Sequence, residues 1–168
     1  MAGKITLLDT EKITYEGVFD LKELYKHLYE WLAWRKYDIS EKKYKEKVKS
    51  TGKDMEIKWE ANKDIDEYST FKIEMKAVLI AVNDVEVQKE SGAKVKMQKG
   101  EINIEVSAHL ITDRQEMWQA KPAFSFLQKF YEKYLYKGSV DRMKGELWKV
   151  GWDFYNEAKA FLNLYKFG

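Results

Sequence analysis

The chain has 168 residues, a formal net charge of +2, 45% hydrophobic and 35% charged residues, and no cysteine. This composition predicts one folded domain over residues 1–168, and it excludes disulfide scaffolds, zinc ribbons, iron–sulfur clusters and cysteine nucleophiles. With two histidines a histidine-rich metal site is excluded as well, so we expect no metal and no cofactor, although a carboxylate site stays open.

The amino-terminal part of the chain predicts a strand followed by a helix. Residues 4–18 alternate loosely between apolar and polar side chains, which is typical of one or two strands. Asp20 can cap a helix, Glu23 completes a capping box, and Phe19 with Leu24 occupies the positions of a hydrophobic staple. Apolar residues then recur at spacings of three and four, so we expect a helix over residues 21–36.

The middle of the chain predicts an antiparallel meander. Period-two alternation marks residues 44–48, 55–61, 71–81 and 95–110, and turn-forming or polar residues separate these segments. Lys99 and Gly100 indicate a bulge or a short turn inside the last segment. Together with the first strand, these segments predict about five to seven antiparallel strands.

The carboxyl-terminal third returns to helical spacing. We expect one helix to begin near Lys121, with Pro122 in its first turn, and to end at Lys137 and Gly138. Ser139 then caps a longer helix over about residues 140–165. The predicted fold class is therefore α+β, a curved antiparallel sheet packed against an N-terminal helix and two C-terminal helices.

This order of strand, helix, antiparallel meander and long C-terminal helix resembles the helix-grip superfamily of Bet v 1-like and START-like domains. In that superfamily a curved sheet wraps the C-terminal helix, and the space between them often holds an apolar ligand. The resemblance implies the same arrangement here, although the superfamily has one C-terminal helix where two are expected in this chain. Its members include lipid carriers, cyclases and cochaperone domains, so the fold by itself does not decide the function.

The leading functional prediction is non-enzymatic binding of an apolar or lipid-like small molecule between the sheet and the C-terminal helix. Aromatic residues recur at helical spacing near Gly151, and a glycine inside a helix permits close approach of a ligand or another backbone. Ordinary core packing would produce the same spacing, and that interpretation stays open. The candidate ligand-lining residues are Trp59, Met75, Leu79, Met97, Val106, Leu147, Trp148, Gly151, Trp152, Phe154 and Tyr155.

The alternative prediction is a structural or protein-interaction module that forms a homodimer through an apolar strand face. Residues 77–82 are apolar on both faces of the expected strand, which requires cover from a helix or from a second subunit. The candidate interface residues are Val78, Ile80, Val82 and Ile111.

Other functional classes find less support in the sequence. Residues 36–53 are rich in lysine but contain no arginine, which is typical of a protected edge strand, and we do not expect a nucleic-acid partner. The chain has no glycine-rich phosphate motif and no GxSxG elbow, which favours binding over catalysis. We expect His27 on the outer side of the first helix and His109 on the outer side of the sheet. Because the chain starts without an apolar leader and has no stretch of about 18 to 20 apolar residues, we expect a cytoplasmic protein without integral membrane association.

Overall fold

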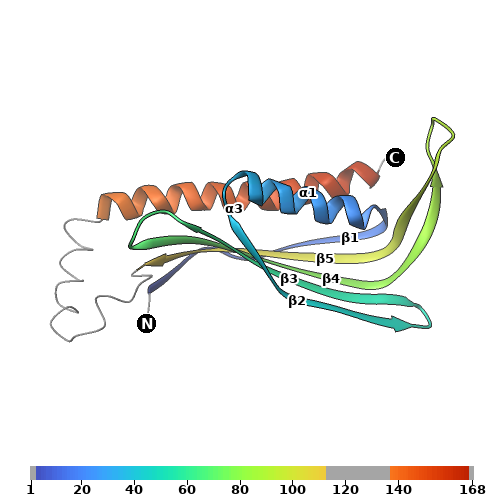
Figure 1. The fold of residues 1–168 in the computed structure, drawn as a ribbon, viewed down its shortest axis with the longest axis horizontal. Helices are drawn as coiled ribbons and strands as arrows, with labels where there is room; N and C mark the ends of the chain where they lie inside the picture. The colour runs from blue at the N-terminus through green and yellow to red at the C-terminus, as the bar shows by residue number, and fades with distance from the viewer. Residues whose placement is uncertain (1–2, 113–136, 167–168) are drawn as a thin grey trace.

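The computed structural model describes residues 3–112 and 137–166 and contains one antiparallel sheet with helices on one side of it (Figure 1). The elements, in chain order, are β1 (Gly3–Phe19), α1 (Leu21–Trp34), β2 (Asp38–Lys49), β3 (Gly52–Asp64), β4 (Ser69–Gln88), β5 (Lys94–Thr112) and α3 (Lys137–Lys166). The α+β class and the curved antiparallel sheet are therefore confirmed. The helix expected from Lys121 lies outside the described residues, so the described part has two helices where three were predicted.

The strand order is β1-β5-β4-β3-β2, and every neighbouring pair is antiparallel. The meander from β2 to β5 uses short connections, while the first strand pairs with the last one. The lysine-rich segment forms β2, which is an edge strand as predicted. Lysines along an edge oppose pairing with another chain, because a second lysine-bearing strand would be repelled.

Helix α1 begins where the sequence predicts. The Asp20 side chain accepts a hydrogen bond from the backbone N–H of Glu23 at 3.1 Å, which satisfies one of the unpaired donors of the first turn. The helix ends at Trp34 rather than at residue 36, because Lys36 adopts a φ of +69°. The backbone N–H of Tyr37 then bonds back to the carbonyl of Leu32 at 3.1 Å.

The core lies between the sheet and the two helices. Alternate residues of the central strands point into it, and α3 contributes a stripe at spacings of three and four, as the helical pattern predicts. The fully or nearly fully buried residues of α3 are Met143, Leu147, Phe154, Ala158 and Leu162. His27 contacts α3 as well as solvent. Its ring stacks on Phe161 with centroids 5.2 Å apart, and its Nε2 lies 2.7 Å from Glu157 Oε1.

A bulge in β4 overturns one sequence prediction. Strict alternation through residues 77–82 predicts that Val82 lies on the outer face with Val78 and Ile80. In the structure the pairing of β4 with β5 shifts between Ile80 and Asn83, and Ala81 adopts a φ of +53°. Val82 therefore turns into the core and is 6% exposed. The predicted irregularity at Gly100 is real, but the one extra residue lies on β4, where Ala81 and Val82 together oppose that glycine.

The start of α3 also differs from the prediction. The helix already includes Gly138 and Ser139, so Ser139 lies inside its first turn rather than at its cap. A helix of this length runs along most of the sheet, and its carboxyl-terminal end comes close to the amino-terminal end of α1 (Figure 1).

Candidate functional site

The space predicted to hold a ligand, beneath the middle of α3, is filled by side chains. Six of the predicted lining residues are core residues with at most 4% of their surface exposed, namely Trp59, Met75, Leu79, Val106, Leu147 and Phe154. Gly151 explains how closely the helix sits on the sheet. A Cβ atom at Gly151 would lie 3.0 Å from Ala108 Cβ and 3.5 Å from Leu8 Cδ2. The close approach predicted for this glycine is thus made by the sheet itself.

Aromatic residues of α3 pack against one another in a row along one side of the helix. Trp148 and Trp152 have ring centroids 6.3 Å apart, and Trp152 and Tyr155 have centroids 5.3 Å apart, both in edge-to-face geometry. Trp148 is 53% exposed, so it does not face the sheet as predicted. The Tyr155 hydroxyl donates to the carbonyl of Lys12 at 3.4 Å, which attaches this flank to β1.

A groove of about 560 Å³ lies at the carboxyl-terminal end of α3. It is lined by residues from the end of β1, the tip of the β4–β5 hairpin and the last turn of α3. Of the predicted ligand-lining residues, it contains Met97. The full lining is Val18, Val87, Gln88, Lys89, Glu90, Ser91, Met97 and Tyr165.

The groove exists because β4 and β5 extend beyond the neighbouring strands β1 and β3. The pairing of β1 with β5 ends at Phe19 and Gln98, and the pairing of β3 with β4 ends at Lys53 and Val82. Beyond these points β4 and β5 continue as a two-stranded ribbon, which rises toward the end of α3 (Figure 1). One face of this ribbon is apolar by register, because Val85 pairs with Met97 and Val87 pairs with Val95, and all four are only half-buried. The ribbon therefore offers apolar surface that the rest of the described chain covers only in part.

The turn at the tip of the ribbon supplies the polar end of the groove. The backbone N–H of Lys89 bonds to the carbonyl of Ala93 at 2.8 Å, and the N–H of Gly92 bonds to the carbonyl of Lys89 at 2.9 Å. Gly92 has a φ of +86°, a conformation that favours glycine over any residue with a side chain. This turn places Lys89, Glu90 and Ser91 beside the apolar wall.

Tyr165 closes the groove on the helix side. Burial raises the pKa of its hydroxyl, and the carboxylates of Asp20 and Glu23 act in the same direction. The ring also packs edge-to-face on Phe161, with centroids 5.6 Å apart. Tyr165 therefore carries a neutral hydroxyl at physiological pH, and its ring presents both an apolar face and a polar edge.

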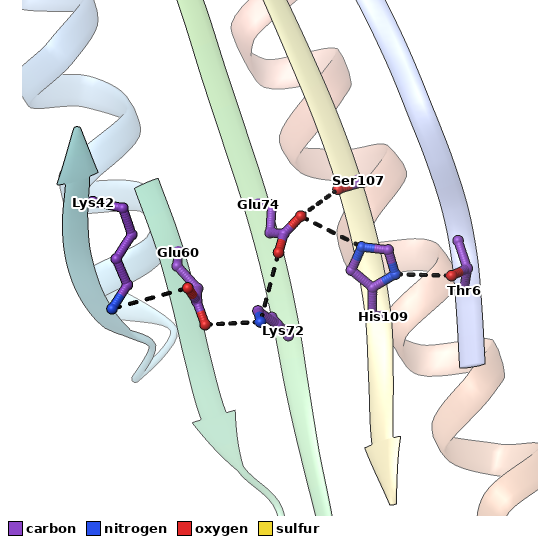
Figure 2. A network of polar contacts seen from close by, with 7 residues as sticks. All are labelled: Thr6, Lys42, Glu60, Lys72, Glu74, Ser107 and His109. Atoms are coloured by element: carbon purple, nitrogen blue, oxygen red, sulfur yellow. Dashed lines mark hydrogen bonds and ion pairs between the residues drawn. The ribbon is translucent and has the colours of Figure 1, made fainter. Parts of the chain in front are cut away.

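A second polar arrangement crosses the sheet face away from the helices (Figure 2). Thr6 Oγ1 lies 3.0 Å from His109 Nδ1, and His109 Nε2 lies 3.6 Å from Glu74 Oε2. Lys72 continues the row to Glu74 at 3.6 Å and to Glu60 at 2.8 Å. Its hydrogen bond with Lys72 holds the pKa of Glu60 below its ordinary value.

His109 occupies the outer face as predicted, but it is buried, with 5% of its surface exposed. Burial lowers the pKa of its imidazole, the Lys4 and Lys72 cations act in the same direction, and Glu74 opposes them. A row of hydroxyl, imidazole and carboxylate can activate a nucleophile, and here it runs across the hydrogen-bonded strands β1, β5 and β4. The row therefore acts as a cross-strand tie that joins β1, β5, β4 and β3.

No group of three or more histidine, aspartate or glutamate side chains is placed to hold a metal ion within residues 3–112 and 137–166. In the same residues, no helix has the length and apolarity needed to cross a membrane. Comparison of the chain with protein-family models and with curated protein sequences yields no match.

Proposed function

We propose that the protein binds a small apolar or amphipathic molecule in the groove between the end of α3 and the β4–β5 ribbon. The observation that carries the proposal is the groove of about 560 Å³ with apolar walls from Val18, Val87 and Met97 and an aromatic wall from Tyr165. This volume lies within the range of about 300–1,000 Å³ that is typical of small-molecule sites. The proposal keeps the predicted ligand class and moves the site from the middle of α3 to its end.

The topology supports the same proposal. The first strand pairs with the last, and the final helix lies against the curved sheet, which resembles the arrangement expected for helix-grip domains. Those domains use the space between the sheet and the last helix, and in this chain that space is open at the end of the helix. Apolar burial would supply the binding energy: about 250 Å² of covered ligand surface is worth about 6 kcal/mol, before the cost of association.

The proposal can be tested with an environment-sensitive dye such as 1-anilinonaphthalene-8-sulfonate, followed by displacement with alkyl alcohols of increasing chain length. We expect saturable binding at one site, and tighter displacement as the alkyl chain lengthens. Met97→Glu places a charge in the apolar wall and should abolish binding. Leu164→Glu is the matched control, because Leu164 is 72% exposed on the same end of α3 and does not line the groove.

The proposal fails if Met97→Glu and Leu164→Glu bind the dye equally well. Methyl NMR of the valines gives an independent location, because shifts should concentrate at Val18 and Val87. Shifts concentrated elsewhere would contradict this site even if the dye bound. Circular dichroism on both variants shows whether each retains the fold.

A further inference from the structure

The groove at the end of α3 contains a polar group whose role the surrounding contacts define, the hydroxyl of Tyr165. The carboxyl-terminal end of α3 comes close to the start of α1 (Figure 1), and the hydroxyl forms a hydrogen bond with the backbone of Asp20, between β1 and α1. Because this hydrogen bond lowers the pKa of the hydroxyl, it favours the phenolate, so the Asp20 N–H donates and the hydroxyl oxygen accepts. Val18, just before this junction, forms the neighbouring wall of the groove.

A hydroxyl that accepts in this way still has its own proton to donate. Among residues 3–112 and 137–166, none accepts a hydrogen bond from the Tyr165 hydroxyl. The carboxylates of Asp20 and Glu23 act on it only through space, and Asp20 Oδ1 already accepts the backbone N–H of Glu23 at 3.1 Å. When the groove is occupied, the ligand is therefore the partner left for this donor.

We propose that the ligand of the groove is an uncharged molecule with an apolar chain and an oxygen acceptor, such as an ester or a ketone, and that the Tyr165 hydroxyl donates a hydrogen bond to this oxygen. The inference rests on the proposed function, because it takes the groove as the binding site and assigns the chemistry of the ligand's polar end. It makes neutral esters and ketones better ligands than fatty-acid anions or alkylammonium ions of the same chain length.

The surroundings of the hydroxyl disfavour a negative head group. Burial raises the pKa of Tyr165 because the phenolate would lose its hydration, and the carboxylates of Asp20 and Glu23 raise it further by repulsion. A ligand carboxylate against this hydroxyl would meet the same loss of hydration and the same repulsion. An anion at this end of the groove therefore binds less well than a neutral oxygen.

A positive head group is disfavoured for a different reason. An ammonium group has only donors, so it cannot accept the proton of the Tyr165 hydroxyl, and it too loses hydration on burial. The charged residues that line the groove, Lys89 and Glu90, are neighbours on the turn and have opposite signs, so together they favour neither charge. An ester or ketone oxygen accepts the hydrogen bond without burying a charge.

The other walls of the groove suit the apolar chain of such a ligand. Val18 and Val87 present only hydrocarbon, and Met97 adds a flexible thioether that can adapt to chains of different shape. These walls bind an alkyl chain without fixing its length. Selectivity is therefore expected at the head group, where the Tyr165 hydroxyl lies.

Isothermal titration calorimetry on the full chain tests the head group with four compounds that share an eight-carbon chain: methyl octanoate, methyl octyl sulfide, octanoate and octylammonium. We expect wild type to bind the ester at least about fivefold more tightly than either ion. Tyr165→Phe keeps the ring and removes the hydroxyl, so it should weaken ester binding about five- to tenfold. Binding of the sulfide should change less than about twofold, because a thioether is a weak acceptor.

Tyr155→Phe is the matched control, because it is the same substitution on the same helix. The Tyr155 hydroxyl donates to the carbonyl of Lys12 at 3.4 Å, and Tyr155 does not line the groove. We expect this variant to bind the ester as wild type does. A second measurement needs no variant and remains decisive if Tyr165→Phe fails to fold. The nuclear Overhauser effect in wild type should connect the ester O-methyl protons with the ring of Tyr165.

The possible outcomes separate this inference from the proposed function. Ester binding that is unchanged in Tyr165→Phe, an equal loss for ester and sulfide, or tighter binding of either ion would overturn the inference and leave the groove as the site. The absence of contact between the O-methyl group and Tyr165 in the bound state would overturn it as well. If none of the four compounds binds, or if Met97→Glu weakens none of them, the proposed function itself fails.

Discussion

The packing of α3 on the sheet can be tested at two glycines of the same helix. Gly145 and Gly151 both lie inside α3, where glycine costs about 0.5–1 kcal/mol relative to alanine. Their surroundings differ. A Cβ at Gly145 would meet nothing within 4 Å, whereas one at Gly151 would lie 3.0 Å from Ala108 Cβ. The same substitution to alanine therefore isolates the contact with the sheet.

The two effects at Gly151 have opposite signs. Helix propensity favours alanine by about 0.5–1 kcal/mol, while overpacking in a rigid core costs about 1–3 kcal/mol. Ala108 is fully buried on β5, paired on both sides, and cannot move without its neighbours. We therefore expect Gly151→Ala to lower the free energy of unfolding by about 1 kcal/mol. Gly145→Ala should raise it by about 0.5–1 kcal/mol.

Urea denaturation followed by circular dichroism measures both changes, and an unchanged slope with urea shows that the midpoint shift reports stability. The double variant Gly151→Ala/Ala108→Gly removes the atom that the new Cβ would meet. Its coupling energy should be favourable, because the two single changes share one contact. If Gly151→Ala stabilises the protein as much as Gly145→Ala does, α3 does not rest on the sheet at this point.

Three further outcomes follow from the buried groups. Burial lowers the pKa of His109 in the folded state, so the unfolded chain binds the proton more readily. The free energy of unfolding should therefore fall as the pH drops below about 6.5. The urea midpoints at pH 7.5 and pH 5.5 should differ less in His109→Gln than in wild type. Asp20→Ala should lower the free energy of unfolding by about 1 kcal/mol, because the α1 cap is lost. Urea denaturation measures this change, and an unchanged free energy of unfolding would contradict the capping role. Phe154→Ala should lower the free energy of unfolding by about 3–5 kcal/mol, because this side chain is fully buried against Trp31. Trp148→Ala should lower it far less, since Trp148 is 53% exposed. Thermal denaturation compares the two variants, and equal losses would contradict the placement of the two rings.

Much of the fold could be predicted because local patterns and tertiary packing agree. The Asp20 cap, the apolar face of α1 and the alternation of β3 follow from spacing and side-chain chemistry, and each reappears in the structure. The edge position of the lysine-rich strand follows in the same way, because only an edge tolerates so many exposed charges. Gly151 indicated a contact point, because glycine weakens a helix and its presence there suggests that a larger residue would not fit.

The bulge in β4 could not be predicted from alternation. It depends on Ala81, a residue with a side chain, adopting a positive φ, and on partners from another strand. Asp54 Oδ1 accepts the backbone N–H of Ala81 at 2.9 Å, and Asn83 donates to the carbonyl of Thr51 at 3.0 Å. These contacts join positions about thirty residues apart in the chain, so no local pattern reports them. One shifted residue was enough to move Val82 from the outer face into the core.

By itself the sequence determined the α+β fold class, the types of the described elements, the buried side of each strand up to the bulge in β4, and the abundance of aliphatic and aromatic surface. Tertiary structure alone decided where that surface stays open. The middle of α3 is filled because Gly151 lets the helix descend onto Ala108, while the groove forms because β4 and β5 extend past β1 and β3. Periodicity reports which way a side chain points, but whether a space is filled depends on the lengths and distances of elements far apart in the chain.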